Sequence, residues 1–368
     1  MVIHRLLLSE KISKNPEIRE SLSWYFLVLE KKVPSKINIC IRIPVEENLI
    51  ELSYKELWKL HEEKSKEFNE IKEETINGKS ISKKRILEKS FLDLKIEIAK
   101  RILKSCILCE RKCKINRENK IGFCRVKETR ISEYFLHYGE ELPLIPSGTI
   151  FFTGCNFKCV YCQNWTISQY PNSGIVVNYV DLANIQEKLY KMGAKNINWV
   201  GGDPTPNIYE ILKSMKEFAK KDLYIPQLWN SNMYLSEESM KILLDLIDIW
   251  LPDFKYGNDE CAMKYSSVKN YFEIVSRNHL MIKNESVIVR HLVLPNHIEC
   301  CSKKILEWIS KNTPKFLVNI MDQYHPDYLV LSTNNYPELS RKLFENELYE
   351  VYKFADSLDI KWKEISIY

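Results

Sequence analysis

Three cysteines stand close together near the middle of the 368-residue sequence, and their spacing suits a metal cluster. Cys155, Cys159 and Cys162 form a C-x3-C-x2-C pattern. Three thiolates on one tight loop can hold three irons of a 4Fe–4S cluster and leave the fourth iron open for a substrate or cofactor. A structural zinc loop or a set of buried free thiols is the plainer alternative. Zinc usually takes four ligands, and no fourth ligand follows closely after Cys162, so we favour the cluster.

The elements around these cysteines must bring them to one place. Residues 149–153 are apolar, β-branched and aromatic, which predicts a buried strand that leads into the cysteine loop. Glycine is scarce, with ten in the whole chain, yet seven of the ten lie between Gly139 and Gly202. Because glycine allows positive φ angles and close backbone approach, we expect this window to form the floor of the site.

A second group of cysteines precedes the first. Cys106, Cys109, Cys113 and Cys124 follow a C-x2-C-x3-C-x10-C pattern, and this four-cysteine element can close around one metal ion or one cluster. The spacing alone does not show whether the bound group is zinc or an auxiliary 4Fe–4S cluster. The many basic residues around it could offset the charge of the thiolates, contact an acidic partner or simply be solvated. We interpret the remaining cysteines as core or surface thiols: Cys40, Cys261, Cys300 and Cys301.

From residue 149 onward the sequence alternates between strand and helix patterns. We predict strands near 149–154, 196–201, 225–230, 247–254, 286–294, 316–321 and 360–366. We predict helices near 181–192, 206–220, 237–245, 269–283, 301–312 and 338–357. This alternation implies an α/β fold with a parallel sheet, which can curl into a full or partial barrel with its ligand site at the carboxyl ends of the strands.

Side chains that could bind a charged ligand follow the predicted strands. Gly201 and Gly202 would let a ligand lie against bare backbone, and the Asp203 carboxylate could bind an ammonium group. Asn230 and Asn232 end the third strand, where their amides could bind ribose or carboxylate oxygens.

The later strands add charged groups. Asp253 and Lys255 stand two apart on an extended segment and therefore share a face. They form either a structural ion pair or a ligand-binding pair, because neither is readily buried alone. Arg290 interrupts the apolar fifth strand, and we expect it to point into the barrel. After the sixth strand, Tyr324 and His325 are candidate substrate-side groups.

The sequence around the three cysteines resembles the radical S-adenosylmethionine (radical SAM) superfamily. The shared features are the C-x3-C-x2-C motif and the aromatic Tyr161 before its last cysteine. Residues 147–155 and 162–169 are similar to one branch, the proteins resembling pyruvate formate-lyase activating enzymes, and the likeness covers about residues 100–330. It implies a partial, TIM-like (β/α)6 barrel with a similar four-cysteine element just ahead of it.

The resemblance also implies the cofactors. Cys155, Cys159 and Cys162 would be the catalytic cluster ligands, and S-adenosylmethionine would bind at the open iron. Asp203 stands where the superfamily has a glutamate that holds the methionyl amine, and it is one methylene shorter. The residues expected to bind the cofactor are Tyr161, Gly201, Gly202, Asp203, Asn230, Asn232, Asp253, Lys255 and Arg290.

The activity that the resemblance implies is reductive cleavage of S-adenosylmethionine to a 5′-deoxyadenosyl radical, with an electron from ferredoxin or flavodoxin. The radical would either activate a glycyl-radical protein or modify a small molecule, peptide or RNA. A non-catalytic iron–sulfur or zinc binding module is an alternative of another class. Such a module would not need the strand-end residues, so we favour the enzyme.

Length and composition allow one large domain and a smaller one. We predict a mainly helical N-terminal extension over 1–105, a metal-binding segment over 106–148 and the barrel over 149–368. The extension should contain a small hairpin with strands over 23–29 and 37–44. The region with the two helices described next either acts as a cover or docking surface or serves only for packing.

Two helices are predicted in the second half of this extension. The first runs from a capping box at Ser53 and Glu56 to about Glu74. The second runs from about Ser82 to Ser105, with an apolar stripe on one face.

Charge and hydropathy limit the partners. A formal net charge of +5 is mild and does not indicate a nucleic-acid partner, although it does not exclude one. The sequence has no apolar run of the length a membrane span needs and no pattern of a signal peptide, so we expect a cytoplasmic protein.

Overall fold

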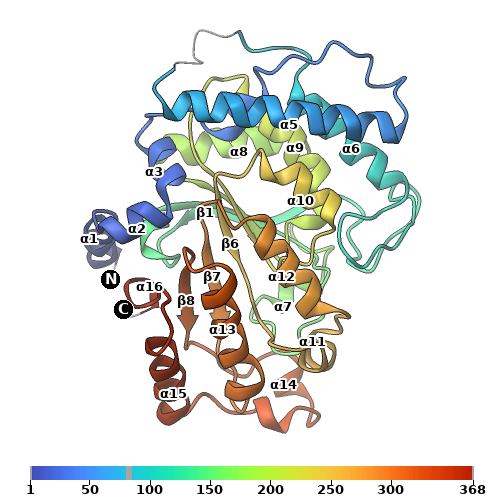
Figure 1. The fold of residues 1–368 in the computed structure, drawn as a ribbon. Coiled ribbons are helices and arrows are strands. Elements are labelled where there is room, and N and C mark those ends of the chain that lie inside the picture. The colour runs from blue at the N-terminus through green and yellow to red at the C-terminus, as the bar shows by residue number, and fades with distance from the viewer. Residues whose placement is uncertain (1, 80–84, 367–368) are drawn as a thin grey trace.

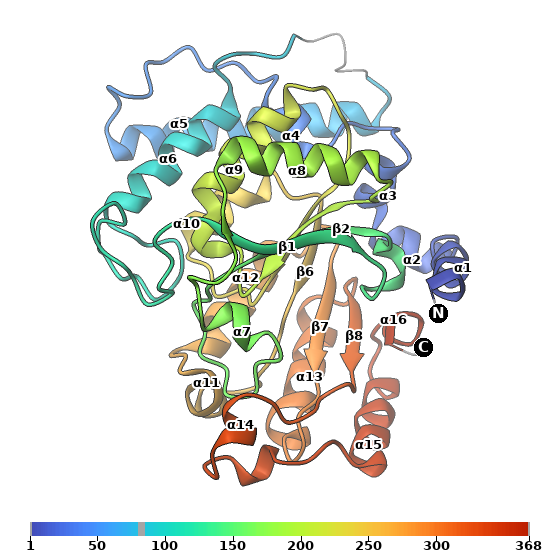
Figure 2. The ribbon, with the colours of Figure 1, turned by 180° about the vertical axis from the view of Figure 1, so that it is seen from behind.

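Six parallel strands form the centre of the fold in the computed structural model, which describes residues 2–79 and 85–366 (Figures 1 and 2). The strands are β2 (Ser147–Phe152), β4 (Ile197–Gly201), β5 (Gln227–Ser231), β6 (Ile249–Pro252), β7 (Ile288–Leu292) and β8 (Leu317–Met321). Parallel pairing joins β2, β4, β5 and β6 in that order, and β7 to β8. Single parallel bridges from Trp250 to Val287 and from Asp253 to Arg290 connect β6 to β7. No described strand joins β8 back to β2, which confirms a partial (β/α)6 barrel.

The outer edge of this sheet carries two strands that the sequence analysis missed. β1 (Arg130–His137) pairs antiparallel with β2, and the short β3 (Ile175–Val176) pairs with β1. β1 is partly exposed along most of its length. It therefore lacks the continuous apolar run that marks a central parallel strand.

Helices follow the parallel strands on the outside of the sheet. They are α8 (Tyr179–Lys191), α9 (Ile208–Ala219), α10 (Glu237–Leu244), α12 (Tyr271–Met281), α13 (Lys303–Asn312) and α15 (Glu345–Asp356). All six lie within or close to predicted ranges. Shorter helical segments are α7 (Trp165–Ser168), α11 (Asp259–Ser266), α14 (Leu329–Ser332), α16 (Lys363–Ser366), η1 (Leu142–Leu144), η2 (Thr205–Asn207), the π-helical η3 (Ile298–Ser302) and η4 (Pro337–Leu339).

The strand predicted near 360–366 is wrong. Only Lys361 makes a bridge, to Leu317 of β8, and the chain then turns into α16. The Ser366 hydroxyl accepts a hydrogen bond from the Ile320 backbone N–H and donates one to the Val318 carbonyl. These bonds dock the turn against β8 without extending the sheet.

Every named secondary-structure element in the described part of the N-terminal extension is a helix. These helices are α1 (Val2–Ile12), α2 (Pro16–Ser21), α3 (Ser23–Leu29), α4 (Lys36–Cys40), α5 (Tyr54–Ile76) and α6 (Phe91–Lys104). The predicted hairpin is therefore wrong, because α3 and α4 occupy its two strands. Every residue of α4 is buried, and short apolar runs do not distinguish a buried helix from a strand.

The two longer helices of the extension were predicted more closely. Ser53 and Glu56 form the expected capping box at the start of α5. α6 begins at Phe91, later than predicted, because Ser90 and Asp93 form a capping box there. The predicted start at Ser82 lies outside the described residues. α6 packs against α9 and α10, so the extension covers the outer helices.

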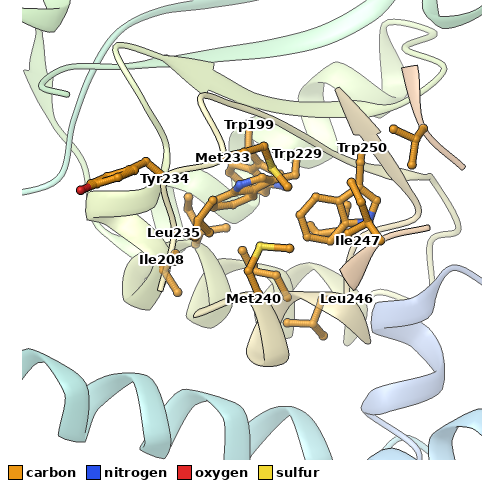
Figure 3. Packing of buried hydrophobic residues seen from close by; sticks show 14 of the residues in the cluster. Trp199, Ile208, Trp229, Met233, Tyr234, Leu235, Met240, Leu246, Ile247 and Trp250 are labelled. Carbon is orange, nitrogen blue, oxygen red and sulfur yellow. The ribbon is translucent and has the colours of Figure 1, made fainter. Parts of the chain in front are cut away.

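Three tryptophans on neighbouring strands organise the core between sheet and helices (Figure 3). Trp199 pairs in register with Trp229, which pairs with Trp250, and all three are fully buried. Successive side chains of a strand point to opposite faces of the sheet. When a tryptophan faces the helices, the next residue therefore faces the interior of the barrel. The neighbour of Trp229 is Asn230, one of the predicted site residues. One hydrophobic cluster contains buried residues of both the extension and the barrel. The predicted domain boundaries therefore stay a prediction.

Candidate active site

The three-cysteine loop, residues 154–164, leaves the carboxyl end of β2 as predicted. Cys155 and Cys159 are buried and Cys162 is partly exposed. A donor or hydroxyl lies beside each sulfur: Phe157 N–H is 3.3 Å from Cys155 Sγ, Ser266 Oγ is 2.9 Å from Cys159 Sγ, and Ser168 Oγ is 3.2 Å from Cys162 Sγ. Hydrogen bonds to ligand sulfurs orient them and tune the group that they bind.

Burial raises the pKa of all three thiols, to about 11 at Cys159 and well above the usual value at Cys155. A thiolate in these positions therefore needs a cation, and coordination by a metal deprotonates a thiol outright. The donor set fits a cluster bound by three thiolates.

All three cysteines open onto one cavity of about 390 Å³ at the carboxyl ends of the strands. The predicted cofactor-binding residues that line this cavity are Tyr161, Gly201, Gly202, Asp203, Asn230, Asn232, Asp253, Lys255 and Arg290. The structure thus brings together every residue of that prediction, and their roles in binding stay predictions. Tyr324 and His325 do not line the cavity. Tyr324 is buried with its hydroxyl donating to the Leu339 carbonyl, and His325 is exposed.

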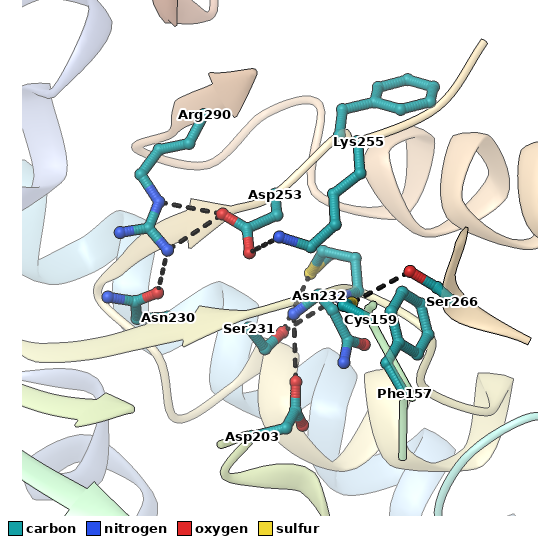
Figure 4. A network of polar contacts seen from close by, with 12 residues as sticks. Phe157, Cys159, Asp203, Asn230, Ser231, Asn232, Asp253, Lys255, Ser266 and Arg290 are labelled. Atoms are coloured by element: carbon teal, nitrogen blue, oxygen red, sulfur yellow. Dashed lines mark hydrogen bonds and ion pairs between the residues drawn. The ribbon is translucent and has the colours of Figure 1, made fainter. Parts of the chain in front are cut away.

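Asp203 is buried at the end of β4, with one per cent of its surface exposed. Its Oδ1 accepts a hydrogen bond from the Thr205 backbone N–H at 2.9 Å. Its Oδ2 accepts one from the Asn232 backbone N–H at 3.0 Å (Figure 4). Burial raises the pKa of this carboxyl to about 6. Each oxygen keeps a second lone pair, so the ionised group can still accept a bond from an ammonium group.

Gly201 and Gly202 also have a structural role, and their predicted role against a ligand stays a prediction. Gly201 has a φ of +124°, and a Cβ atom there would lie 2.2 Å from backbone atoms of Phe152. A Cβ on Gly202 would lie 2.2 Å from the Gly154 carbonyl oxygen. The two glycines therefore let the ends of β4 and β2 meet, which places Asp203 beside the three-cysteine loop.

A charged network crosses the cavity from β5 to β7 (Figure 4). Arg290 donates to Asp253 Oδ1 through Nε at 3.0 Å and to Asn230 Oδ1 through Nη2 at 2.6 Å. Lys255 Nζ lies 2.8 Å from the other oxygen of Asp253. Burial opposes ionisation of Asp253, but Arg290 and Lys255 hold its pKa below the usual value. The predicted pair is thus an ion pair that also lines the site, and Arg290 points inward as expected.

Two buried carboxyls behind this network were missed by the sequence analysis. Glu140 lines the cavity, accepts a bond from Asn198 Nδ2 at 2.7 Å and lies 3.6 Å from Arg290 Nη1. Glu141 accepts a bond from Asn319 Nδ2 at 2.9 Å, and burial together with Glu140 raises its pKa to about 7. The available signal was an acidic pair directly before the apolar residues 142–146.

The four-cysteine element lies against the three-cysteine loop. Its four cysteines line one small cavity: Cys106, Cys109, Cys113 and Cys124. Arg111 donates to the Asn156 carbonyl at 2.9 Å, and its guanidinium lies 3.8 Å from the centre of the Phe123 ring. This arginine therefore connects the two cysteine groups. The residues predicted to bind one metal do meet in space.

Comparison with known proteins places the chain. The sequence model of the family described as "Radical SAM superfamily" matches residues 149–309. The chain belongs to the radical SAM superfamily. This is a superfamily of enzymes that use S-adenosylmethionine and a 4Fe–4S cluster, and the recognition made from the cysteine motif is confirmed.

Sequence relatives of this radical SAM protein include two from Methanocaldococcus jannaschii. The uncharacterized protein MJ0674 is 44% identical over 345 residues, which cover 92% of this chain and 98% of the relative. The uncharacterized protein MJ0808 is 27% identical over 278 residues, 67% of this chain and 80% of the relative.

The solved structures that match have lower sequence identity. Streptococcus suis SuiB bound to S-adenosylmethionine matches with a TM-score of 0.43 and 11% identity, over 56% of this chain and 47% of that one. A domain of a pyruvate-formate lyase-activating enzyme from Bacteroides vulgatus matches with a TM-score of 0.35 and 13% identity, over 46% and 98%. The chain spans less than half the length of the SuiB structures.

Within residues 2–79 and 85–366, no helix has the length and hydropathy that crossing a membrane requires.

Proposed function

We propose that the chain cleaves S-adenosylmethionine at the three-cysteine loop and directs the 5′-deoxyadenosyl radical to a glycyl-radical protein, which it activates. The observation that carries this proposal is the single cavity that contains three thiols, the buried Asp203 carboxylate and two cationic side chains. A 4Fe–4S cluster bound by Cys155, Cys159 and Cys162 would supply the electron for cleavage, delivered by a low-potential donor such as ferredoxin or flavodoxin.

Different side chains around the cavity would bind different groups of S-adenosylmethionine. Asp203 has free lone pairs for the methionyl ammonium group. Lys255 uses one of its three donors on Asp253, so two donors are left for the methionyl carboxylate. Arg290 is held on three sides, by Asp253, Asn230 and Glu140. We infer that Arg290 mainly positions Asp253 and Lys255.

The residues around the mouth of the cavity leave access for a large substrate. Among the described residues that line it, none precedes His137. The N-terminal extension packs instead on α9 and α10 and, through α1 to α3, on η1 and on residues near the start of the barrel strands, such as Ile249, Ile288 and Leu317, away from the carboxyl ends (Figures 1 and 2). A protein loop could therefore approach without displacing the extension, which removes the main reason to expect a sealed small molecule. A small molecule, a peptide or RNA is the alternative that the assay below distinguishes.

A second metal is proposed at the four-cysteine element. Among the described residues, no three of its four sulfur atoms lie within 4.8 Å of one another. Tetrahedral zinc, with Zn–S bonds of about 2.3 Å, needs sulfurs about 3.8 Å apart. The wider spacing supports an auxiliary 4Fe–4S cluster over zinc, and Arg111 would lie between the two clusters.

The test is an anaerobic assay of the reconstituted and reduced enzyme with S-adenosylmethionine. Chromatography should detect 5′-deoxyadenosine that a Cys159→Ala control does not form. If the wild type forms no more 5′-deoxyadenosine than the control, with cluster and reductant verified, the result favours a non-catalytic binding module. When 5′-deoxyadenosine does form, addition of a candidate glycyl-radical protein should give a glycyl doublet in the electron paramagnetic resonance spectrum. Turnover without a doublet on any candidate protein would favour the other substrate classes.

A further inference from the structure

Cys261 meets the adjacent pair Cys300 and Cys301, which are distant from it in sequence, on the side of the barrel that carries α11. Cys261 lies in the first turn of α11, and Cys300 and Cys301 lie in η3. The Cys261 and Cys300 sulfurs are 3.9 Å apart, those of Cys300 and Cys301 are 3.7 Å apart, and all three lie within 4.8 Å of one another. These cysteines are free thiols at the edge of the core, as expected, but no pattern in the sequence indicated that they lie together. We call them the cysteine triad.

The spacing of the triad fits one metal ion. Tetrahedral zinc with bonds of about 2.3 Å holds its sulfur ligands about 3.8 Å apart. The Cys300–Cys301 and Cys261–Cys300 distances, 3.7 and 3.9 Å, lie on either side of this value. A disulfide would need sulfurs about 2.05 Å apart. Among the described residues, this is the only group of three potential ligand atoms with such close mutual spacing. The other cysteine groups of the chain, which suit larger clusters, do not share it.

The surroundings of the triad stabilise thiolates. Asn258, the N-cap of α11, directs its side-chain amide at Cys261 Sγ from 3.3 Å and at Cys301 Sγ from 3.8 Å. The same amide donates to the Cys300 carbonyl at 2.9 Å, so one side chain contacts all three cysteines. Such N–H donors around ligand sulfurs are typical of protein metal sites. The amino end of α11 adds a partial positive charge next to Cys261.

The triad supplies three ligands and leaves the fourth position to solvent. His297 lies beside Cys261, but its Nδ1 bonds the Pro295 carbonyl at 2.7 Å and its Nε2 bonds the Tyr265 hydroxyl at 3.0 Å. Both ring nitrogens are therefore engaged. Cys261 and Cys300 are partly exposed, so water can reach a bound ion. Three protein ligands and one exchangeable water are the coordination of catalytic zinc sites, whereas structural zinc sites usually have four protein ligands.

We propose that Cys261, Cys300 and Cys301 bind one thiophilic divalent cation, with zinc as the best fit, at a site separate from the active-site cavity. The ion joins α11 to η3. The other end of α11 supports the three-cysteine loop, because Ser266 Oγ contacts Cys159 Sγ, and the carbonyls of Ser266 and Tyr265 accept bonds from the N–H groups of Lys158 and Val160. The metal thus holds the helix on which the three-cysteine loop rests.

The experiment uses the full chain after anaerobic reconstitution of its clusters and gel filtration, so that the other metal-binding cysteines are occupied before zinc is added. Titration of Zn²⁺ against a chromophoric chelator should show one zinc per chain for the wild type and none for Cys261→Ser/Cys300→Ser. Cys40→Ser, which changes a buried cysteine outside all three groups, should keep the wild-type stoichiometry. Equal zinc binding by the wild type and the double variant, or no binding by either, would overturn the proposal.

Two further measurements make the result independent of the proposed function and of variant folding. In a Cys155→Ala/Cys159→Ala/Cys162→Ala background, adding Cys261→Ser/Cys300→Ser should still remove one zinc per chain. Wild-type crystals soaked in Zn²⁺ and measured at the zinc absorption edge should show an anomalous peak among the three sulfur atoms. Zinc that binds in solution without a peak at this position would refute the site.

Discussion

The Asp203 carboxylate is the group whose charge should matter most for the binding of S-adenosylmethionine. It is buried, lines the cavity and is held by two backbone N–H groups. A charge-assisted hydrogen bond in such a place is worth about 1.5–3 kcal/mol. Asp203→Asn keeps the size and removes the charge. Since about 1.4 kcal/mol changes a dissociation constant tenfold, the variant should bind roughly 10- to 100-fold more weakly.

The pH dependence of binding gives a second readout for the same group. Burial raises the pKa of Asp203 to about 6, so the carboxyl is mainly ionised at pH 7.5 and increasingly protonated below pH 6. Wild-type affinity should therefore fall as the pH is lowered from 7.5 to 5.5. The Asp203→Asn variant has no charge to lose and should lack this dependence.

The assay is anaerobic equilibrium dialysis of S-adenosylmethionine against reconstituted protein, with iron content measured for each variant. Asp203→Glu restores the charge and the side-chain length usual in the superfamily, and it should recover most of the affinity. Asp359→Asn, at an exposed position far along the chain, should behave as the wild type. An unchanged dissociation constant in Asp203→Asn, at equal iron content, would remove Asp203 from the site.

Three further predictions concern metals and stability. Replacing Cys155, Cys159 or Cys162 with Ala should abolish the S-adenosylmethionine-sensitive electron paramagnetic resonance signal of the reduced protein, and a signal that survives in all three variants would contradict the cluster. The triple variant should still hold about four irons per chain at the four-cysteine element; a folded, metal-free triple variant would count against that site. The raised pKa of Glu141, about 7, means that stability from this group is present at pH 4 and is lost as the pH rises through 7. Glu141→Gln should therefore raise the melting temperature at pH 8.5 but not at pH 4, and an equal effect at both values would refute the assignment.

Much of the site was predictable because its signals are local. The three cysteines lie within eight residues, and a strand before them sets where the loop begins. The other residues lie in or directly after strands of a parallel sheet, and the carboxyl ends of such strands meet at one edge. Asp203, Asn230, Asp253 and Arg290 therefore converge without any knowledge of distances.

The errors arose where burial overrode local preference. The apolar run from Ile37 to Ile43 predicted a strand, but the segment packs as the buried helix α4 and the turn after it. β1 was missed because an edge strand with partly exposed residues lacks a continuous apolar run. Glu140 and Glu141 were missed because a charged pair in a loop usually lies in solvent, whereas here Asn198, Asn319 and Arg290 surround it.

The sequence by itself determined the superfamily, the partial barrel and the residues at its strand ends, since repeating strand–helix units leave few ways to pack. Only the tertiary structure decided which distant groups meet. Cys261 and Cys300 are separated by 39 positions, and no spacing rule predicts that α11 and η3 bring their sulfurs within 3.9 Å. The same holds for the position of the N-terminal extension. Its first helices bury apolar residues against η1 and the barrel strands, its later helices pack on the outer helices, and none of its described residues lines the cavity. Contacts of this kind depend on how complete elements pack, which local patterns do not encode.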